Sequence, residues 1–90
     1  MSATVHLPAY LQQYTGGAAE VRVEGTTAAE CLRHLVQQFP DLTRMLFASE
    51  GRLHDYVSVY VNEQFAFGEE LSRPVKDGDI LHILYILGGG

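Results

Sequence analysis

The feature that most constrains the fold of this chain is an apolar run close to its C-terminus. The run, Ile80-Leu81-His82-Ile83-Leu84-Tyr85-Ile86-Leu87, is rich in β-branched and large apolar side chains, which favour a strand buried inside a sheet. Asp77-Gly78-Asp79 comes directly before it and predicts a turn. The sequence therefore predicts a sheet with this strand among its inner members.

Three glycines, Gly88, Gly89 and Gly90, follow the run. They carry no Cβ that could anchor them, and glycine loses more backbone entropy on ordering than any other residue. We expect a folded domain over residues 1–87 and a flexible tail over residues 88–90. Such a thin tail can enter a narrow active site and present the carboxylate of Gly90 to another enzyme. The spacing alone leaves open a frayed end without chemistry.

Two alternating segments predict a hairpin at the start of the chain. Thr4–Leu7 places alternate residues on one face, and Pro8 ends it because proline has no N–H to donate. Ala9–Tyr14 is expected to form a helical turn or an irregular loop, and Thr15-Gly16-Gly17 supplies a glycine turn. Glu20–Glu24 alternates again and is predicted to pair with the first strand.

One strong helix is predicted after this hairpin. Thr27 followed by Glu30 is a capping-box pattern, in which the threonine oxygen accepts an N–H and the glutamate reaches back. Pro40 marks the end of the helix. Four apolar residues recur at helical spacing and are expected on the buried face: Leu32, Leu35, Val36 and Phe39.

The second half of the chain predicts a short helical turn and a strand. Asp41–Phe47 has enough apolar residues for a turn packed under the sheet, and Ser49–Gly51 breaks it. Tyr56–Val61 is the clearest strand, with valines on one face, and Asn62 begins the turn after it because asparagine tolerates left-handed φ. Two further residues should cover the bottom of the core: Leu71 and Val75.

Charge and composition exclude several classes of function. Ninety residues allow one small domain, and 47% hydrophobic with 19% charged residues is typical of a folded protein. The net charge of -5 argues against a nucleic-acid partner and favours a basic surface on a partner protein. No run is long enough to span a bilayer, and the first residues lack the pattern of a signal peptide, so we expect a cytoplasmic protein without a membrane partner.

Metal and thiol chemistry find little support in the sequence. Cys31 is the single cysteine, so neither an internal disulfide nor a cysteine-ligated metal site can form from this chain alone. We interpret it as a small core residue, the alternative being a reactive thiol at a helix N-terminus. The four histidines show no ligand spacing, so we expect no metal site: His6, His34, His54 and His82.

The chain resembles the ubiquitin-like sulfur carriers of the MoaD/ThiS family. The resemblance lies in the Asp-Gly-Asp turn, the last strand and the final glycine pair, Gly89-Gly90. Many carriers have proline where this chain has Tyr85-Ile86-Leu87. Further segments carry it in the same order along the chain: Leu7-Pro8-Ala9, Thr15-Gly16-Gly17, Phe39-Pro40-Asp41-Leu42, Gly51-Arg52-Leu53 and Val59-Tyr60-Val61-Asn62.

The resemblance implies an α+β fold, the ubiquitin-like β-grasp, in which a mixed sheet packs on one main helix. It also implies that the chain is a carrier and not an enzyme, and that it binds no cofactor itself. An E1-like adenylating enzyme would use ATP to activate Gly90, next to Gly89. A sulfur donor protein would then convert the Gly90 carboxylate to a thiocarboxylate, and a downstream sulfur-accepting synthase would use it in cofactor, cysteine or natural-product biosynthesis.

Partner binding is expected around the root of the tail. In the tail itself the candidates are Ile86, Leu87 and Gly88. If Leu81 and Ile83 face the helix, an open sheet face carries the other candidates, which are Tyr60, His82 and Leu84, with Tyr56, Ser58 and His6 beside them. Tyrosines are also common on exposed strands through propensity alone, so both interpretations stand.

Two other functions remain compatible with the sequence. The same activated Gly90 would be passed to lysine amines if the chain were a ubiquitin-like protein modifier. A non-catalytic β-grasp binding module would have a tail without chemistry. The sequence specifies neither the acceptor pathway nor whether a longer precursor is trimmed to Gly90.

Overall fold

The structure is a computed structural model that describes residues 2–62, 64–65 and 71–85. Its main sheet has five strands in the order β2-β1-β7-β5-β6. The strands are β1 (Ser2–His6), β2 (Glu20–Glu24), β5 (Val57–Val61), β6 (Gln64–Phe65) and β7 (Ile80–Tyr85). The alternation of Glu20–Glu24 predicted its strand with the observed bounds, whereas β1 begins two residues earlier than predicted and ends one residue earlier.

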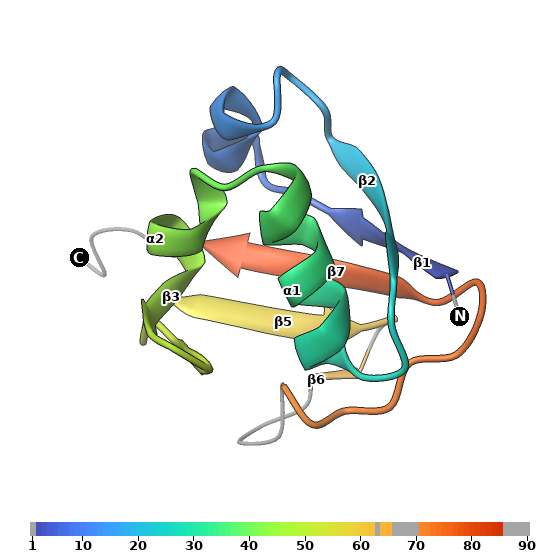
Figure 1. Cartoon of the computed structure of the whole chain (residues 1–90). Helices are drawn as coiled ribbons and strands as arrows, with labels where there is room; N and C mark the ends of the chain where they lie inside the picture. The colour runs from blue at the N-terminus through green and yellow to red at the C-terminus, as the bar shows by residue number, and fades with distance from the viewer. Residues whose placement is uncertain (1, 63, 66–70, 86–90) are drawn as a thin grey trace.

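The first and last strands lie side by side in the middle of the sheet and run parallel (Figure 1). Val5 is in register with Leu81 and His6 with His82. The outer pairs, β1 with β2 and β5 with β7, are antiparallel. This mixed sheet confirms the prediction of an inner final strand.

Helix α1 (Ala28–Gln38) crosses one face of the sheet (Figure 1). Thr27 is its N-cap, and the Thr27 hydroxyl accepts a hydrogen bond from Glu30 N at 3.2 Å, as predicted. The Glu30 carboxylate, however, reaches Thr26 and not Thr27, and it accepts from Thr26 N at 2.8 Å and Thr26 Oγ1 at 2.9 Å. Both hydrogen bonds lower the pKa of Glu30, and the bond from the Thr26 backbone has the larger effect.

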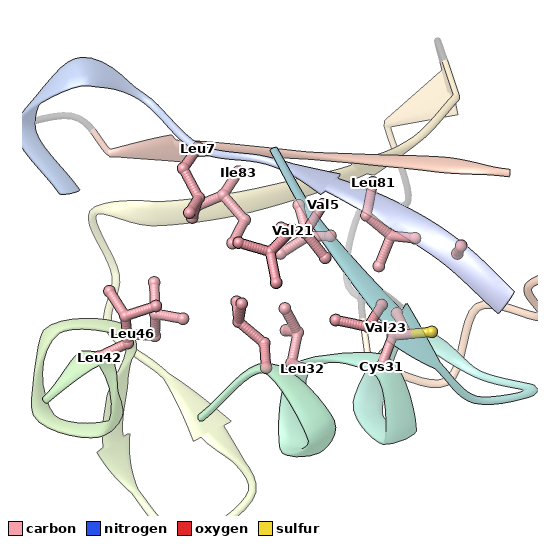
Figure 2. Packing of buried hydrophobic residues seen from close by; sticks show 14 of the residues in the cluster. Val5, Leu7, Val21, Val23, Cys31, Leu32, Leu42, Leu46, Leu81 and Ile83 are labelled. Carbon is pink, nitrogen blue, oxygen red and sulfur yellow. The ribbon is translucent and has the colours of Figure 1, made fainter. Parts of the chain in front are cut away.

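The buried face of α1 is rotated from the predicted one. Leu32 and Leu35 are fully buried as expected, but Val36 and Phe39 are half-buried and pack on the edge of the core. Ala28 completes the buried face together with Cys31, which was already interpreted as a core residue, because small side chains allow the helix to approach the sheet closely. Figure 2 shows Cys31 and Leu32 reaching from α1 toward the sheet residues.

The remaining elements connect these layers. The 3-10 helix η1 (Ala9–Tyr14) follows β1, at the position of the predicted helical turn. Helix α2 (Leu42–Leu46) places Leu42 and Leu46 in the core, as predicted for the short turn over Asp41–Phe47. The predicted turns are confirmed by the positive φ of Gly16, Gly17 and Asn62. Val75 is buried and Leu71 packs against the core, as predicted. The sequence predicted only a break where β3 (Phe47–Ser49) and β4 (Arg52–Leu53) form a hairpin, and it missed β6.

Candidate functional site

The root of the predicted tail lies at one end of the sheet. Tyr85, the last residue that the structure describes, is paired with Val57 across β5 and β7. Since β7 has neighbours on both sides, its direction is fixed by two ladders of backbone hydrogen bonds. The predicted tail residues lie outside the described residues, and their roles stay predictions: Ile86, Leu87, Gly88, Gly89 and Gly90.

The three predicted face residues, Tyr60, His82 and Leu84, share the sheet face opposite α1. Tyr60 is in register with His82, and Leu84 with Ser58. Their neighbours along the strands are buried, and Leu84 is 41% exposed although it is a large apolar residue. The geometry therefore confirms a common open face, while partner binding on this face stays a prediction.

His6 joins this face, as its strand position indicated. Its ring meets the His82 ring edge-on, with 4.9 Å between the ring centroids, and its Nε2 lies 3.6 Å from the Glu20 carboxylate. Glu20, His6, His82 and Tyr60 thus form a row across four neighbouring strands. Within the residues that the structure describes, no group of three or more His, Cys, Asp or Glu is arranged to hold a metal ion.

An aromatic cluster lies at the root of the tail, and no local sequence pattern indicates it. The Tyr10 ring stacks on Tyr85 at 5.2 Å, the Tyr56 ring meets Tyr85 edge-on at 5.1 Å, and the His54 ring stacks on Tyr56 at 4.7 Å. Tyr10 is 44% exposed and Tyr56 38%. Burial and a hydrogen bond to Tyr56 raise the pKa of Tyr85 to about 12.

The aspartates of the turn before β7 tie the opposite end of the sheet together. The Asp77 carboxylate accepts from Ser2 N at 2.9 Å and Ser2 Oγ at 3.1 Å, which lowers the pKa of Asp77. Asp79 accepts from Lys76 N at 2.8 Å and from Asn62 Nδ2 at 3.1 Å. The two aspartates therefore stabilise the turn, as predicted, and do not form a pair of catalytic acids.

The Cys31 side chain is fully buried, which confirms its interpretation as a core residue. Burial is the main cause that raises the pKa of its thiol, and the nearby Glu30 carboxylate raises it further. Because the thiolate is the reactive form, the alternative of a reactive thiol at the helix N-terminus is wrong.

Comparisons with known proteins agree with this architecture. The model of the ThiS family matches residues 5–90. The sulfur carrier protein CysO of Mycobacterium tuberculosis H37Rv is 33% identical over 93 residues, which cover 100% of both chains.

Among solved structures, the chain in the Amycolatopsis orientalis BexX/CysO complex has a TM-score of 0.87 at 34% identity, covering 98% of this chain and 99% of that one. SAMP1 of Haloferax volcanii has a TM-score of 0.86 at 29% identity, with 100% of both chains covered. These neighbours confirm the predicted β-grasp fold. In the part of the chain that the structure describes, no helix has the length and apolarity to cross a membrane.

Proposed function

This chain belongs to the ThiS family, and we propose that its Gly90 carboxylate is converted to a thiocarboxylate that donates sulfur. The relatives named CysO are sulfur carrier proteins, and the chain is a small ubiquitin-like carrier rather than an enzyme. The observation that carries the proposal is the match over the whole length, which includes the terminal glycine pair.

The chemistry follows from the poor leaving ability of a carboxylate oxygen. A partner enzyme joins the Gly90 carboxylate to the AMP part of ATP, and pyrophosphate leaves. Hydrosulfide then attacks the acyl carbon and a C–S bond forms. The C–O bond to the phosphate breaks, AMP leaves with its electron pair, and the S–H proton passes to solvent. If the donor is a persulfide, a further thiol must break its S–S bond. No side chain of this domain has to act as the base.

Recognition by the adenylating enzyme is assigned to the open sheet face. His82 and Leu84 lie on the strand that leads to Gly90, and Tyr60 lies on the neighbouring strand, so an enzyme that binds these residues also receives the tail. The net charge of -5 suits a basic enzyme surface. A solved neighbour is a carrier in complex with BexX, which supports binding of a partner by this fold.

A second candidate function is conjugation of Gly90 to lysine amines of other proteins. The observation that favours it is the similarity to SAMP1, which is named a small archaeal modifier protein. Both functions share the activation of Gly90, and they differ in the nucleophile that attacks it. A binding module without tail chemistry is the third reading, and it predicts that loss of the glycines changes nothing.

The experiment that tests the proposal measures the intact mass of the chain. The protein is incubated with the host's adenylating enzyme, a sulfide source and ATP, beside a sample without ATP. We expect a gain equal to the exchange of one oxygen for sulfur, located on the C-terminal fragment. A chain without Gly89 and Gly90 is the control and should stay unchanged.

The molecule that receives the sulfur or the acyl group distinguishes a sulfur carrier from a protein modifier. Sulfur appearing in a small metabolite or cofactor precursor supports the carrier, including the cysteine or natural-product pathways. Adducts of the whole chain on lysines of other proteins would instead support the modifier. If the mass stays constant with every adenylating enzyme while a known carrier shifts, the thiocarboxylate proposal is refuted.

A further inference from the structure

The chain contains one lysine, Lys76, and takes its other positive charges from five arginines. The difference matters for an acyl-activated protein, because a lysine amine attacks activated acyl carbons and a guanidinium, always protonated, does not. A carrier whose own lysine reached Gly90 would cap itself before sulfur arrived. The position of Lys76 relative to the tail therefore bears on the lifetime of the activated state.

Lys76 lies at the end of the sheet opposite the tail root. It is exposed in the turn before β7, where its backbone N–H donates to Asp79, and the start of β1 lies at the same end (Figure 1). The six residues of β7, Ile80–Tyr85, separate this end from the tail root by about 17 Å at a strand rise of about 3.3–3.4 Å. The five residues 86–90 span at most about 17 Å. The tail would have to run back fully extended along the whole strand to approach Lys76.

Three other nucleophiles of the described chain, Cys31, Tyr85 and His82, are poor acceptors for separate reasons. The thiol of Cys31 is fully buried under the sheet and held in its protonated form. The phenol of Tyr85, at the tail root, stays protonated because its pKa is raised to about 12. The half-buried imidazole of His82 would give an acyl imidazole, which hydrolyses back to the carboxylate. The two rings in contact with Tyr85 at the tail root, Tyr10 and Tyr56, carry no amine.

We propose that this arrangement keeps Lys76, the single lysine of the chain, away from an activated Gly90, so that the acyl group is reserved for an external nucleophile. The inference rests on the proposed activation of Gly90. The reaction that it excludes is attack of a neutral lysine Nζ on the Gly90 acyl carbon. In that reaction a C–N bond forms, the bond to the leaving group breaks, and the amine proton passes to solvent.

The test needs no partner enzyme, so its failure is distinguishable from failure of the thiocarboxylate proposal. The chain is prepared with Gly90 as a small-thiol thioester by intein cleavage, and the intact mass is followed in mildly alkaline buffer. Native protein should give only the hydrolysed acid. An internal amide would have a mass lower than the acid by one water, and peptide mapping locates its amine.

Matched variants place an amine beside the tail. Tyr10→Lys introduces one next to Tyr85, and Tyr10→Arg adds the same charge without a nucleophile; Tyr56→Lys and Tyr56→Arg repeat the pair at a second exposed position. Circular dichroism checks that each variant is folded. We expect the internal amide with lysine, and hydrolysis alone with arginine.

Unfolding supplies a measurement on the unchanged sequence. In concentrated urea the separation imposed by the sheet disappears, and an amine linked by a short flexible segment reaches an effective concentration in the ~mM range. The wild-type thioester should then form an internal amide on Lys76, and Lys76→Arg should lose that product. An amide on Lys76 in the native wild type, or hydrolysis alone in both folded lysine variants, would overturn the proposal.

Discussion

Replacement of Asn62 tests how the turn after β5 holds the start of β7. Asn62 has φ 57°, its Nδ2 donates to the Asp79 carboxylate at 3.1 Å, and its Oδ1 accepts from Ile80 N at 3.0 Å. Asn62→Ala removes both side-chain hydrogen bonds, each with a net value of about 0.5–1.5 kcal/mol. It also places a Cβ residue without local hydrogen bonding in the left-handed region, at a cost of about 1 kcal/mol. We expect a loss of about 2–4 kcal/mol.

Asn62→Gly is the matched variant. It loses the same hydrogen bonds but adopts positive φ without strain. Glycine also raises the entropy of the unfolded chain, which offsets part of the stability gained from the relief of strain. We expect it to be more stable than Asn62→Ala by up to about 0.5 kcal/mol. Urea unfolding followed by circular dichroism gives both free energies of unfolding, provided that the slopes agree. A greater loss in Asn62→Gly than in Asn62→Ala, or no loss in either variant, would refute the assignment of strain and bonding at this turn.

Three further predictions concern Cys31, Glu30 and Leu84. The Cys31 thiol should react with a chromogenic disulfide reagent only after unfolding, and fast reaction of the native protein would contradict its burial. Because the pKa of Glu30 is lowered, its carboxylate stabilises the fold above the ordinary pKa of 4.5, and this contribution is lost as the pH falls through the lowered value. The melting temperatures of wild type and Glu30→Gln should therefore converge in acid. A constant difference between them would count against the hydrogen bonds of Glu30 to Thr26. Leu84→Asp should weaken binding of the adenylating enzyme by about tenfold or more, which titration calorimetry measures. Its free energy of unfolding in urea should change by less than about 0.5 kcal/mol.

The parts of the fold with a long, regular pattern were predictable from the sequence. Glu20–Glu24 alternates because one face is buried and the other open, and Thr27 with Glu30 marked the helix start because an exposed N–H needs an acceptor. The apolar run before the glycines predicted an inner strand for the same reason. The positions of Tyr60, His82 and Leu84 on one open face followed from this alternation.

Other features depend on contacts that no local pattern encodes. Phe47–Ser49 and Arg52–Leu53 are too short for alternation to be recognised, so their hairpin was missed. The aromatic cluster joins Tyr10 to Tyr85, which belong to opposite ends of the sequence and meet only because β1 and β7 are neighbours. The buried face of α1 was rotated because Ala28 contributes to the core through its fit and not through strong hydrophobicity.

The parallel pairing of β1 with β7 slows folding and makes the fold depend on the whole chain being present. Val5 meets Leu81 across almost the whole sequence, and contacts of such high separation require the chain entropy to be lost before they are rewarded. β7 follows all the other described elements in the chain, yet it occupies the centre of the sheet. A chain cut short during synthesis, before Ile80, would lack the strand on which β1 and β5 both pair. An incomplete product would thus be an unfolded target for proteases rather than a stable decoy that occupies partner enzymes without a tail.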